Sequence, residues 1–197
     1  AVSWFTKAAE QGNTEAQCCL AYAYDLGQGI RKNAAKAAHW YQESANAGDA
    51  FAQDSLGMLY QEGKGVVQDE KMSVKWFRRA AQGGDVDAME SLGYAFDFGI
   101  GVRKNQQKAI HWYTKASEAG NTSSQFNLAL CFQYGDGIAI NKRKAVYWWR
   151  KAAQAGDMKS QYEFAKSLQD GDGVKKDEKA AIDWLKKSAA KGYPRAQ

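Results

Sequence analysis

The stretch Gly99–Gly120 carries the pattern that decides the fold. It opens with Gly99-Ile100-Gly101-Val102, continues through a polar turn to Lys108-Ala109-Ile110-His111-Trp112-Tyr113, and closes at Gly120. The same pattern recurs every 36 residues, and a strict period of this length is the signature of a repeat protein. Its markers are the glycine pairs Gly27/Gly29, Gly63/Gly65, Gly99/Gly101, Gly135/Gly137 and Gly171/Gly173, and the tryptophans Trp4, Trp40, Trp76, Trp112, Trp148 and Trp184.

Each repeat is predicted to form two helices, as residues 85–120 illustrate. Asp85 and Asn105 are suitable N-cap residues, because their side-chain oxygens can accept hydrogen bonds from the first free N–H groups of a helix. The apolar periodicity that follows each cap predicts helices over residues 86–98 and 106–118, and a glycine follows each helix. Short joins make neighbouring helices antiparallel, as in other helical-pair arrays.

The core of each repeat is predicted from small and apolar residues that share one helical face. In the first helix they are Ala88, Leu92, Gly93 and Phe96, and in the second Ala109, Trp112, Tyr113, Ala116 and Ser117. A glycine inside a helix costs about 1 kcal/mol relative to alanine. The position of Gly93 is always small, so we expect a close helix–helix approach there; its counterparts are Ala21, Gly57, Ala129 and Ala165.

These patterns predict an all-α protein, a right-handed α/α superhelical solenoid of about five 36-residue helix–loop–helix repeats. A single array fills residues 1–197: a partial repeat at 1–12, repeats at 13–48, 49–84, 85–120, 121–156 and 157–192, and the start of a further repeat at 193–197. Because the chain opens inside a helix and stops within a repeat, we expect it to be a segment of a longer array.

Composition limits the possible surroundings and partners. The chain is 45% hydrophobic and 25% charged, and it lacks an apolar run long enough to span a membrane. No signal peptide opens this sequence, so the compartment stays open between bacterial cytoplasm and periplasm or secretion. The net charge of +5 arises in residues 142–197, where lysines on second helices favour a solvated outer face over a nucleic-acid site.

The sequence gives no sign of metal or cofactor binding. Cys18, Cys19 and Cys131 are predicted to be free thiols, because their spacing suits neither metal ligation nor an unstrained disulfide. The Gly-Asp-Gly loops lack the glycine and glutamate positions of a calcium-binding EF-hand. We therefore expect no metal and no cofactor.

Catalytic residues are absent from the sequence prediction as well. His39 and His111 share one repeat position that elsewhere accepts Lys, Tyr and Asp, which indicates an exposed and unconstrained site. With only these two histidines, 72 residues apart, no histidine-based triad can be proposed. The prediction is a protein that is not an enzyme; a hydrolase acting on cell-wall or small-molecule substrates is the rival class.

The informative residues are those that do not repeat, on the face of the first helices opposite the core. First helices line the concave groove of helical-pair solenoids, and exposed aromatic residues are typical of binding hot spots. We predict that this groove binds another protein or an extended peptide, with carboxylates steering a basic partner segment. Packing of these side chains between adjacent repeats is the alternative. The predicted groove residues are Phe51, Asp54, Met58, Glu62, Asp87, Glu90, Tyr94, Phe98, Phe126, Leu130, Tyr134, Tyr162 and Lys166.

The repeat unit resembles the Sel1-like repeat family, a relative of the tetratricopeptide repeats. The resemblance rests on Ala52…Leu56-Gly57…Tyr60…Gly63-Lys64-Gly65-Val66 and on Lys108-Ala109…Trp112-Tyr113-Thr114-Lys115-Ala116, and it covers essentially the whole chain. Phe164 and Leu185 depart mildly from the pattern. The family implies a scaffold or adaptor for protein interactions, which in bacteria includes host-interaction factors and immunity proteins against toxins. End-to-end self-association of the array is a further possibility.

Overall fold

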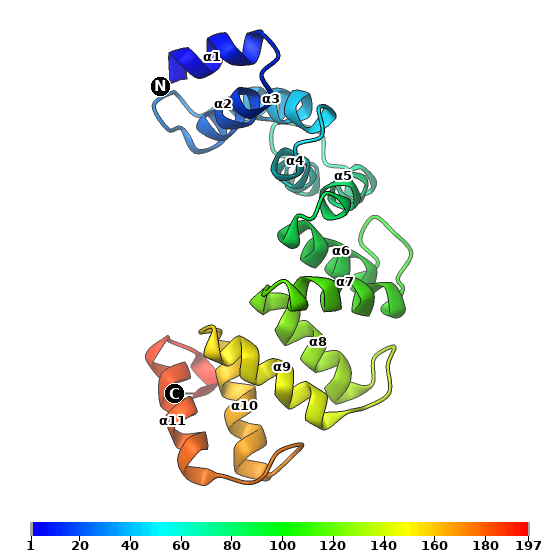
Figure 1. Ribbon diagram of the computed structural model, residues 1–197, viewed down its shortest axis with the longest axis vertical. Coiled ribbons are helices and arrows are strands. Elements are labelled where there is room, and N and C mark those ends of the chain that lie inside the picture. Colours follow the sequence, from blue (N-terminus) through cyan, green and yellow to red (C-terminus); the bar gives the residue numbers. More distant parts are fainter. Residues whose placement is uncertain (1, 197) are drawn as a thin grey trace. The chain divides into compact units, whose positions relative to one another are not determined.

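The computed structural model describes residues 2–196 and consists of helices throughout that range, with no strand among the described residues. The chain forms two compact units, residues 1–104 and residues 105–197 (Figure 1). The first unit contains α1 (Val2–Glu10), α2 (Thr14–Leu26), α3 (Ala34–Asn46), α4 (Ala50–Glu62), α5 (Glu70–Gln82) and α6 (Val86–Phe98). The second contains α7 (Gln106–Glu118), α8 (Thr122–Tyr134), α9 (Lys142–Gln154), α10 (Met158–Asp170), α11 (Glu178–Ala190) and the 3-10 turn η1 (Pro194–Ala196).

The helix boundaries are those that the caps predict. Asp85 accepts a hydrogen bond from the backbone N–H of Ala88 at 2.8 Å and so begins α6. Gly99 ends this helix in the left-handed conformation, with φ of 77°, which a residue with a Cβ rarely adopts. The predicted ranges 86–98 and 106–118 match α6 and α7.

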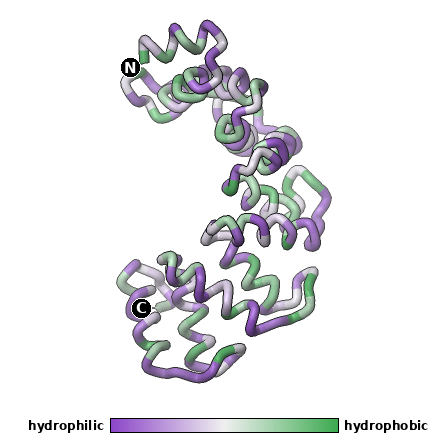
Figure 2. Tube along the Cα trace, in the orientation of Figure 1, coloured by the Kyte–Doolittle hydropathy of each residue, from purple (hydrophilic) through white to green (hydrophobic). Residues whose placement is uncertain are grey.

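Inside the first unit, each pair of neighbouring helices buries the positions that repeat. Leu56 of α4 and Phe77 of α5 are almost fully buried. A Cβ added to Gly57 would lie 2.6 Å from the Phe77 ring, so only glycine allows this ring to approach the α4 backbone. This confirms the predicted close approach at the small position. Figure 2 shows hydrophobic and hydrophilic residues alternating along each helix, as one buried face requires.

Buried glutamines add polar ties that the sequence analysis did not anticipate. Gln53 donates from Nε2 to the carbonyl of Ala45 at 3.0 Å, and Gln17 makes the equivalent bond to Ala9 at 3.3 Å. In the second unit Gln125 and Gln161 donate to Ser117 and Ala153 at 3.1 Å each. The bond ties the start of a first helix to the end of the preceding second helix, where carbonyls lack helical partners.

The tryptophans are less uniform than a common core role would require. Trp76 is 3% exposed, whereas Trp4 is 74% exposed. Trp40 packs against the buried cluster of α1 and α2 formed by Ala9, Ala16 and Leu20. The other repeated tryptophans are half-buried: Trp40, Trp112, Trp148 and Trp184. Burial at this position therefore differs from repeat to repeat.

A matched pair of phenylalanines tests how much ring burial contributes to stability. Phe77→Ala is expected to lower the free energy of unfolding by about 3–5 kcal/mol, because the ring is 2% exposed. Phe5 lies at the same repeat position and is 36% exposed, so Phe5→Ala should cost less than about 2 kcal/mol. Urea unfolding followed by circular dichroism measures both. Equal losses would contradict the packing described here.

Candidate protein-binding face

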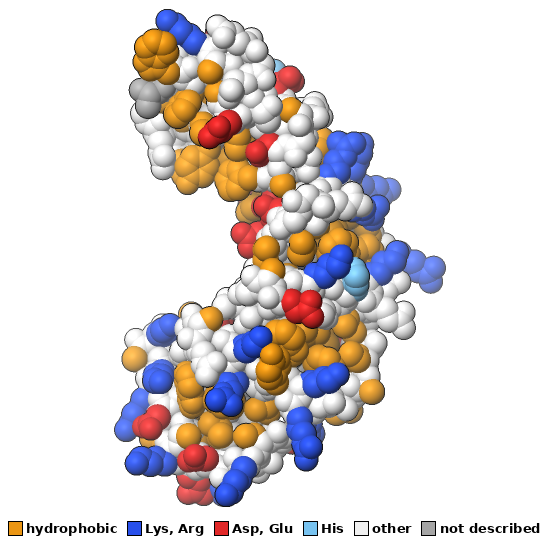
Figure 3. All heavy atoms as spheres, in the orientation of Figure 1, with side chains coloured by type: hydrophobic (Ala, Val, Ile, Leu, Met, Phe, Trp, Pro, Cys, Tyr) orange, Lys and Arg blue, Asp and Glu red, His pale blue; other side chains and the backbone are white. Residues whose placement is uncertain are grey.

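The variable residues of the first helices lie on one face, opposite the residues that pack on the second helices. In the first unit this face is carried by α2, α4 and α6. Its aromatic and thioether side chains are largely open to solvent: Phe51 is 49% exposed, Met58 47%, Tyr94 40% and Phe98 59%. Figure 3 shows hydrophobic and acidic side chains close together on the side of this unit where α4 lies. Their exposure leaves surface on all four residues that a partner could cover, and their binding role stays a prediction.

Ring contacts hold part of this face in place. The Tyr94 and Phe98 rings, one helical turn apart on α6, have centroids 4.5 Å apart. Phe51 of α4 contacts Tyr22 of α2 and the buried Tyr41 of α3, with centroids at 6.3 and 6.5 Å. Such contacts restrict the rotamers of exposed rings, and this lowers the entropy that binding must remove.

The same face of the second unit, on α8 and α10, is more covered. Tyr134 is 68% exposed, but Phe126, Leu130 and Tyr162 are half-buried. Tyr162 packs edge-on against Tyr193 with centroids 5.4 Å apart, which fits the alternative of packing between repeats.

Two lysines lie over rings of this second face, a feature that the sequence analysis missed. The ammonium of Lys159 lies 5.9 Å from the Phe126 ring centroid, and that of the exposed Lys166 lies 5.7 Å from Tyr162. Lys159 occupies the repeat position of Asp87, so one of these cation–π contacts places positive charge where the first unit has a carboxylate. Lysines at i+4 from an aromatic residue, or in the neighbouring helix, are the signal that could have indicated them.

Three of the four predicted carboxylates remain accessible, and one does not. Glu62 and Asp87 are exposed and Glu90 is half-buried, whereas Asp54 is only 8% exposed. Asp54 is therefore not an exposed surface charge, and its part in attracting a basic partner segment stays a prediction. It is enclosed because its position on α4 faces the start of the neighbouring first helix, α6.

The surroundings of Asp54 disfavour its charged form. Its Oδ1 is buried and accepts no hydrogen bond. Burial, followed by the nearby carboxylates of Asp85, Asp87 and Glu90, raises the pKa of Asp54 to about 7. Burial and Asp87 also raise the pKa of Glu90. The first unit thus has a cluster of carboxylates from α4 and α6, formed by Asp54, Asp85, Asp87 and Glu90; we call it the carboxylate recess because Asp54 is buried within it.

Cys18 occupies the repeat position of Asp54 one repeat earlier and faces the corresponding helix start. Burial and the carboxylate of Asp49, the N-cap of α4, raise the pKa of the Cys18 thiol to about 12. This makes it a poor nucleophile. None of the three cysteines forms a disulfide among the described residues.

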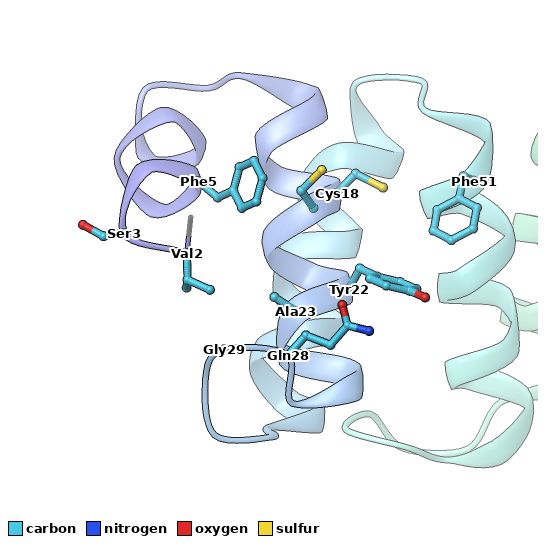
Figure 4. Close-up of a pocket in the computed structure, with 10 residues that line it drawn as sticks. Val2, Ser3, Phe5, Cys18, Tyr22, Ala23, Gln28, Gly29 and Phe51 are labelled. Atoms are coloured by element: carbon cyan, nitrogen blue, oxygen red, sulfur yellow. The ribbon is translucent and has the colours of Figure 1, made fainter.

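An apolar hollow of about 910 Å³ lies at the other edge of the same unit, between α1, α2 and α4 (Figure 4). Phe5 projects into it from α1, Tyr22 from α2 and Phe51 from α4. In the following repeat Tyr41 takes the place of Phe5 and is 1% exposed, because α2 and α4 both pack over it. The hollow therefore lies beside a core-type ring that is only partly covered by the described helices. The sequence signal for it is an aromatic residue at a core position of a partial repeat.

The described residues contain no group of three or more His, Cys, Asp or Glu side chains arranged to hold a metal ion. Across residues 2–196, none of the helices is both long and apolar enough to cross a lipid bilayer.

The repeated helix pairs define an α-solenoid, the class of protein that the sequence analysis predicts. The model of the Sel1 repeat matches residues 1–13, 14–49, 50–85, 86–121, 122–157 and 159–193, and the chain belongs to this family. The predicted resemblance and fold class are thus confirmed. Sel1 repeat proteins are generally scaffolds for protein interactions.

Solved structures give the same assignment. A protective antigen of uropathogenic Escherichia coli strains is 38% identical with a TM-score of 0.96; the match covers 98% of this chain and 42% of the antigen. A Sel1 repeat protein from Oxalobacter formigenes is 34% identical with a TM-score of 0.88, covering 94% of this chain and 74% of that protein. An immunity protein from Pseudomonas aeruginosa, 18% identical over 96% of this chain and 72% of its own, shares the fold with a TM-score of 0.61. Comparison with curated proteins gives no match.

The raised pKa of Asp54 predicts a pH-dependent stability. Its ordinary pKa is about 3.9, so between about pH 4 and 7 the folded protein retains a proton that the unfolded chain has lost. Stability should therefore fall as the pH rises through this window. Since one pKa unit corresponds to about 1.4 kcal/mol, the wild type should lose about 2–4 kcal/mol more than Asp54→Asn between about pH 5 and 8.

Urea unfolding at both pH values measures the loss. Glu43→Gln, which removes an exposed carboxylate of α3, is the control and should keep the wild-type pH dependence. An Asp54→Asn variant whose stability falls with pH as steeply as that of the wild type would contradict the assignment.

Proposed function

We propose that this chain is a non-catalytic protein-interaction module, and that the face of α4 and α6 in the first unit binds a protein or an extended peptide. The observation that carries the proposal is the exposure of Phe51, Met58, Tyr94 and Phe98 at positions where the repeat imposes no residue type. Exposed aromatic clusters lower solubility and are typical of interface hot spots.

The finer assignment is to a bacterial setting. The similarity to an antigen of uropathogenic strains supports a bacterial host-interaction factor, and this chain spans 42% of that antigen. The likeness to immunity proteins lies at 18% identity and supports the fold alone. A toxin-immunity role therefore has weaker support than a host-interaction role.

Removal of three rings from the proposed face tests the function. Phe51→Ala/Tyr94→Ala/Phe98→Ala should weaken binding to a captured partner by more than about tenfold, because buried aromatic anchors dominate interface energies. The melting temperature should change little, since these rings are exposed. The binding constant is measured by biolayer interferometry with a partner identified by cross-linking in a native lysate.

The matched control removes a similar apolar area elsewhere. Val67, Ile140 and Tyr147 are 87%, 62% and 50% exposed and lie outside the first helices. Their triple alanine variant should bind as the wild type does. Binding that survives the first triple variant but not the second would move the proposed site away from α4 and α6.

Self-association through α1 is the second candidate. Trp4 is 74% exposed, Phe5 is 36% exposed, and both border apolar hollows on α1 and α2. If two copies bury these residues, Trp4→Lys/Phe5→Lys should convert a dimer or longer assembly into a monomer, because a charged side chain cannot be buried there without a partner. Light scattering at increasing concentration measures the mass. A stable interface would have a dissociation constant well below about 0.5 mM, so a wild type that is still monomeric at this concentration would reject this candidate.

A further inference from the structure

We propose that the carboxylate recess formed by Asp54, Asp85, Asp87 and Glu90 is a binding site for one guanidinium or ammonium side chain of a partner. The inference rests on the proposed function and specifies the chemistry of the partner segment. It requires a basic side chain at the recess and apolar side chains on either side.

The first argument is that the Asp54 side chain is buried without an ion pair and without a hydrogen bond to its Oδ1. It is 92% buried, and its Oδ1 accepts no hydrogen bond from any described residue. Neither Asp54 nor Glu90 takes part in an ion pair within residues 2–196. Buried polar groups in proteins are nearly always paired, so an unpaired carboxylate lowers stability unless a ligand completes it.

The second argument is that the fold does not require an acid at this place. The residues at the same repeat position are Cys18, Glu90, Phe126 and Tyr162. A small thiol, a carboxylate and two large rings all fit there, so the solenoid can be built without Asp54. A residue that reduces stability and is not needed for packing is typical of a binding site.

The third argument is the arrangement of charge around the recess. Asp85 caps α6, and its carboxylate is the charge that acts most strongly on Asp54. Asp87 and Glu90 follow it on the same helix, about half a turn and about one and a half turns further along. Several carboxylates that meet from two helices attract a cation more strongly than any one of them. An ionic group from a partner segment supplies the missing donors: a guanidinium donates up to five hydrogen bonds in one plane.

The fourth argument concerns the residues that flank the recess. Phe51 and Met58 lie one turn before and one turn after Asp54 on α4, and Tyr94 lies one turn after Glu90 on α6. All three are exposed. A peptide whose basic side chain enters the recess would place its neighbouring residues over these apolar side chains, where the aliphatic stem of an arginine also packs well.

A pair of isosteric peptides tests the site. The probe is the capped pentapeptide Phe-Ala-Arg-Ala-Phe, and its partner carries citrulline, the neutral isostere, in place of arginine. In titrations followed by NMR, the arginine peptide should bind the wild type at least about tenfold more tightly than the citrulline peptide, as expected for a charge pair with a desolvated carboxylate.

Variants locate the effect. Asp54→Asn should abolish the preference for arginine and should fold at least as stably as the wild type, whereas Glu43→Gln should retain the preference. Below about pH 7, binding of the arginine peptide should also release a proton from Asp54, which calorimetry in buffers of different ionisation enthalpy detects.

The outcomes separate the two proposals. Equal binding of both peptides, lost in Phe51→Ala/Tyr94→Ala/Phe98→Ala, would overturn the cation site and leave the apolar face standing. Arginine-selective binding that depends on Asp54, together with partner capture that ignores the three aromatic residues, would retain the site and reject the proposed function. If neither peptide binds at a concentration of about 10 mM, the dissociation constant is too high for a specific site, and the cation site would be overturned.

Discussion

The repeat is held together by a second-helix ring that packs against a small residue of the first helix. Gly57 and Phe77 show the constraint in its strictest form, because a single added Cβ at Gly57 would lie 2.6 Å from the ring. Tyr41, Phe77, Tyr113 and Trp149 occupy this ring position in successive repeats, and each is at most 3% exposed. The rings differ in kind, so this buried position accepts side chains of different shape.

This packing divides each first helix into a core face, whose residues recur, and a variable face, whose residues do not. Residues such as Leu56 and Gly57 lie on the core face, where they must fit the packed ring and the neighbouring helices, and their positions recur as small or apolar residues. Residues such as Phe51 and Met58 lie on the other face, are about half exposed, and vary from repeat to repeat. The buried glutamine hydrogen bonds, such as that from Gln53 of α4 to Ala45 of α3, hold adjacent repeats together. Specificity for a partner can therefore change without change to the scaffold, since stability is close to a sum of repeat and interface terms.

Much of the fold could be predicted from the sequence, and the reason is local. Asp85 and Gly99 each impose a backbone conformation on their own, so the boundaries of α6 follow from the residues present. The exposure of the variable face could not be predicted to the same degree. Asp54 and Glu90 share a repeat position, yet the first is buried and the second half-buried, so the repeat position alone does not determine exposure. Tyr162 likewise is covered through Tyr193, which lies outside its own repeat by the predicted boundaries.

The chemistry of the variable faces differs between the two units, and this narrows the candidate site. On the first, carboxylates stand beside Phe51, Tyr94 and Phe98, and no described cation lies over these rings. On the second, Lys159 and Lys166 already lie over Phe126 and Tyr162. A basic partner segment would meet carboxylates and exposed rings on the first face, but like charge and rings already covered by lysines on the second. Both the aromatic exposure and the unpaired carboxylate thus point to α4 and α6, and the two observations are independent because one concerns apolar area and the other charge.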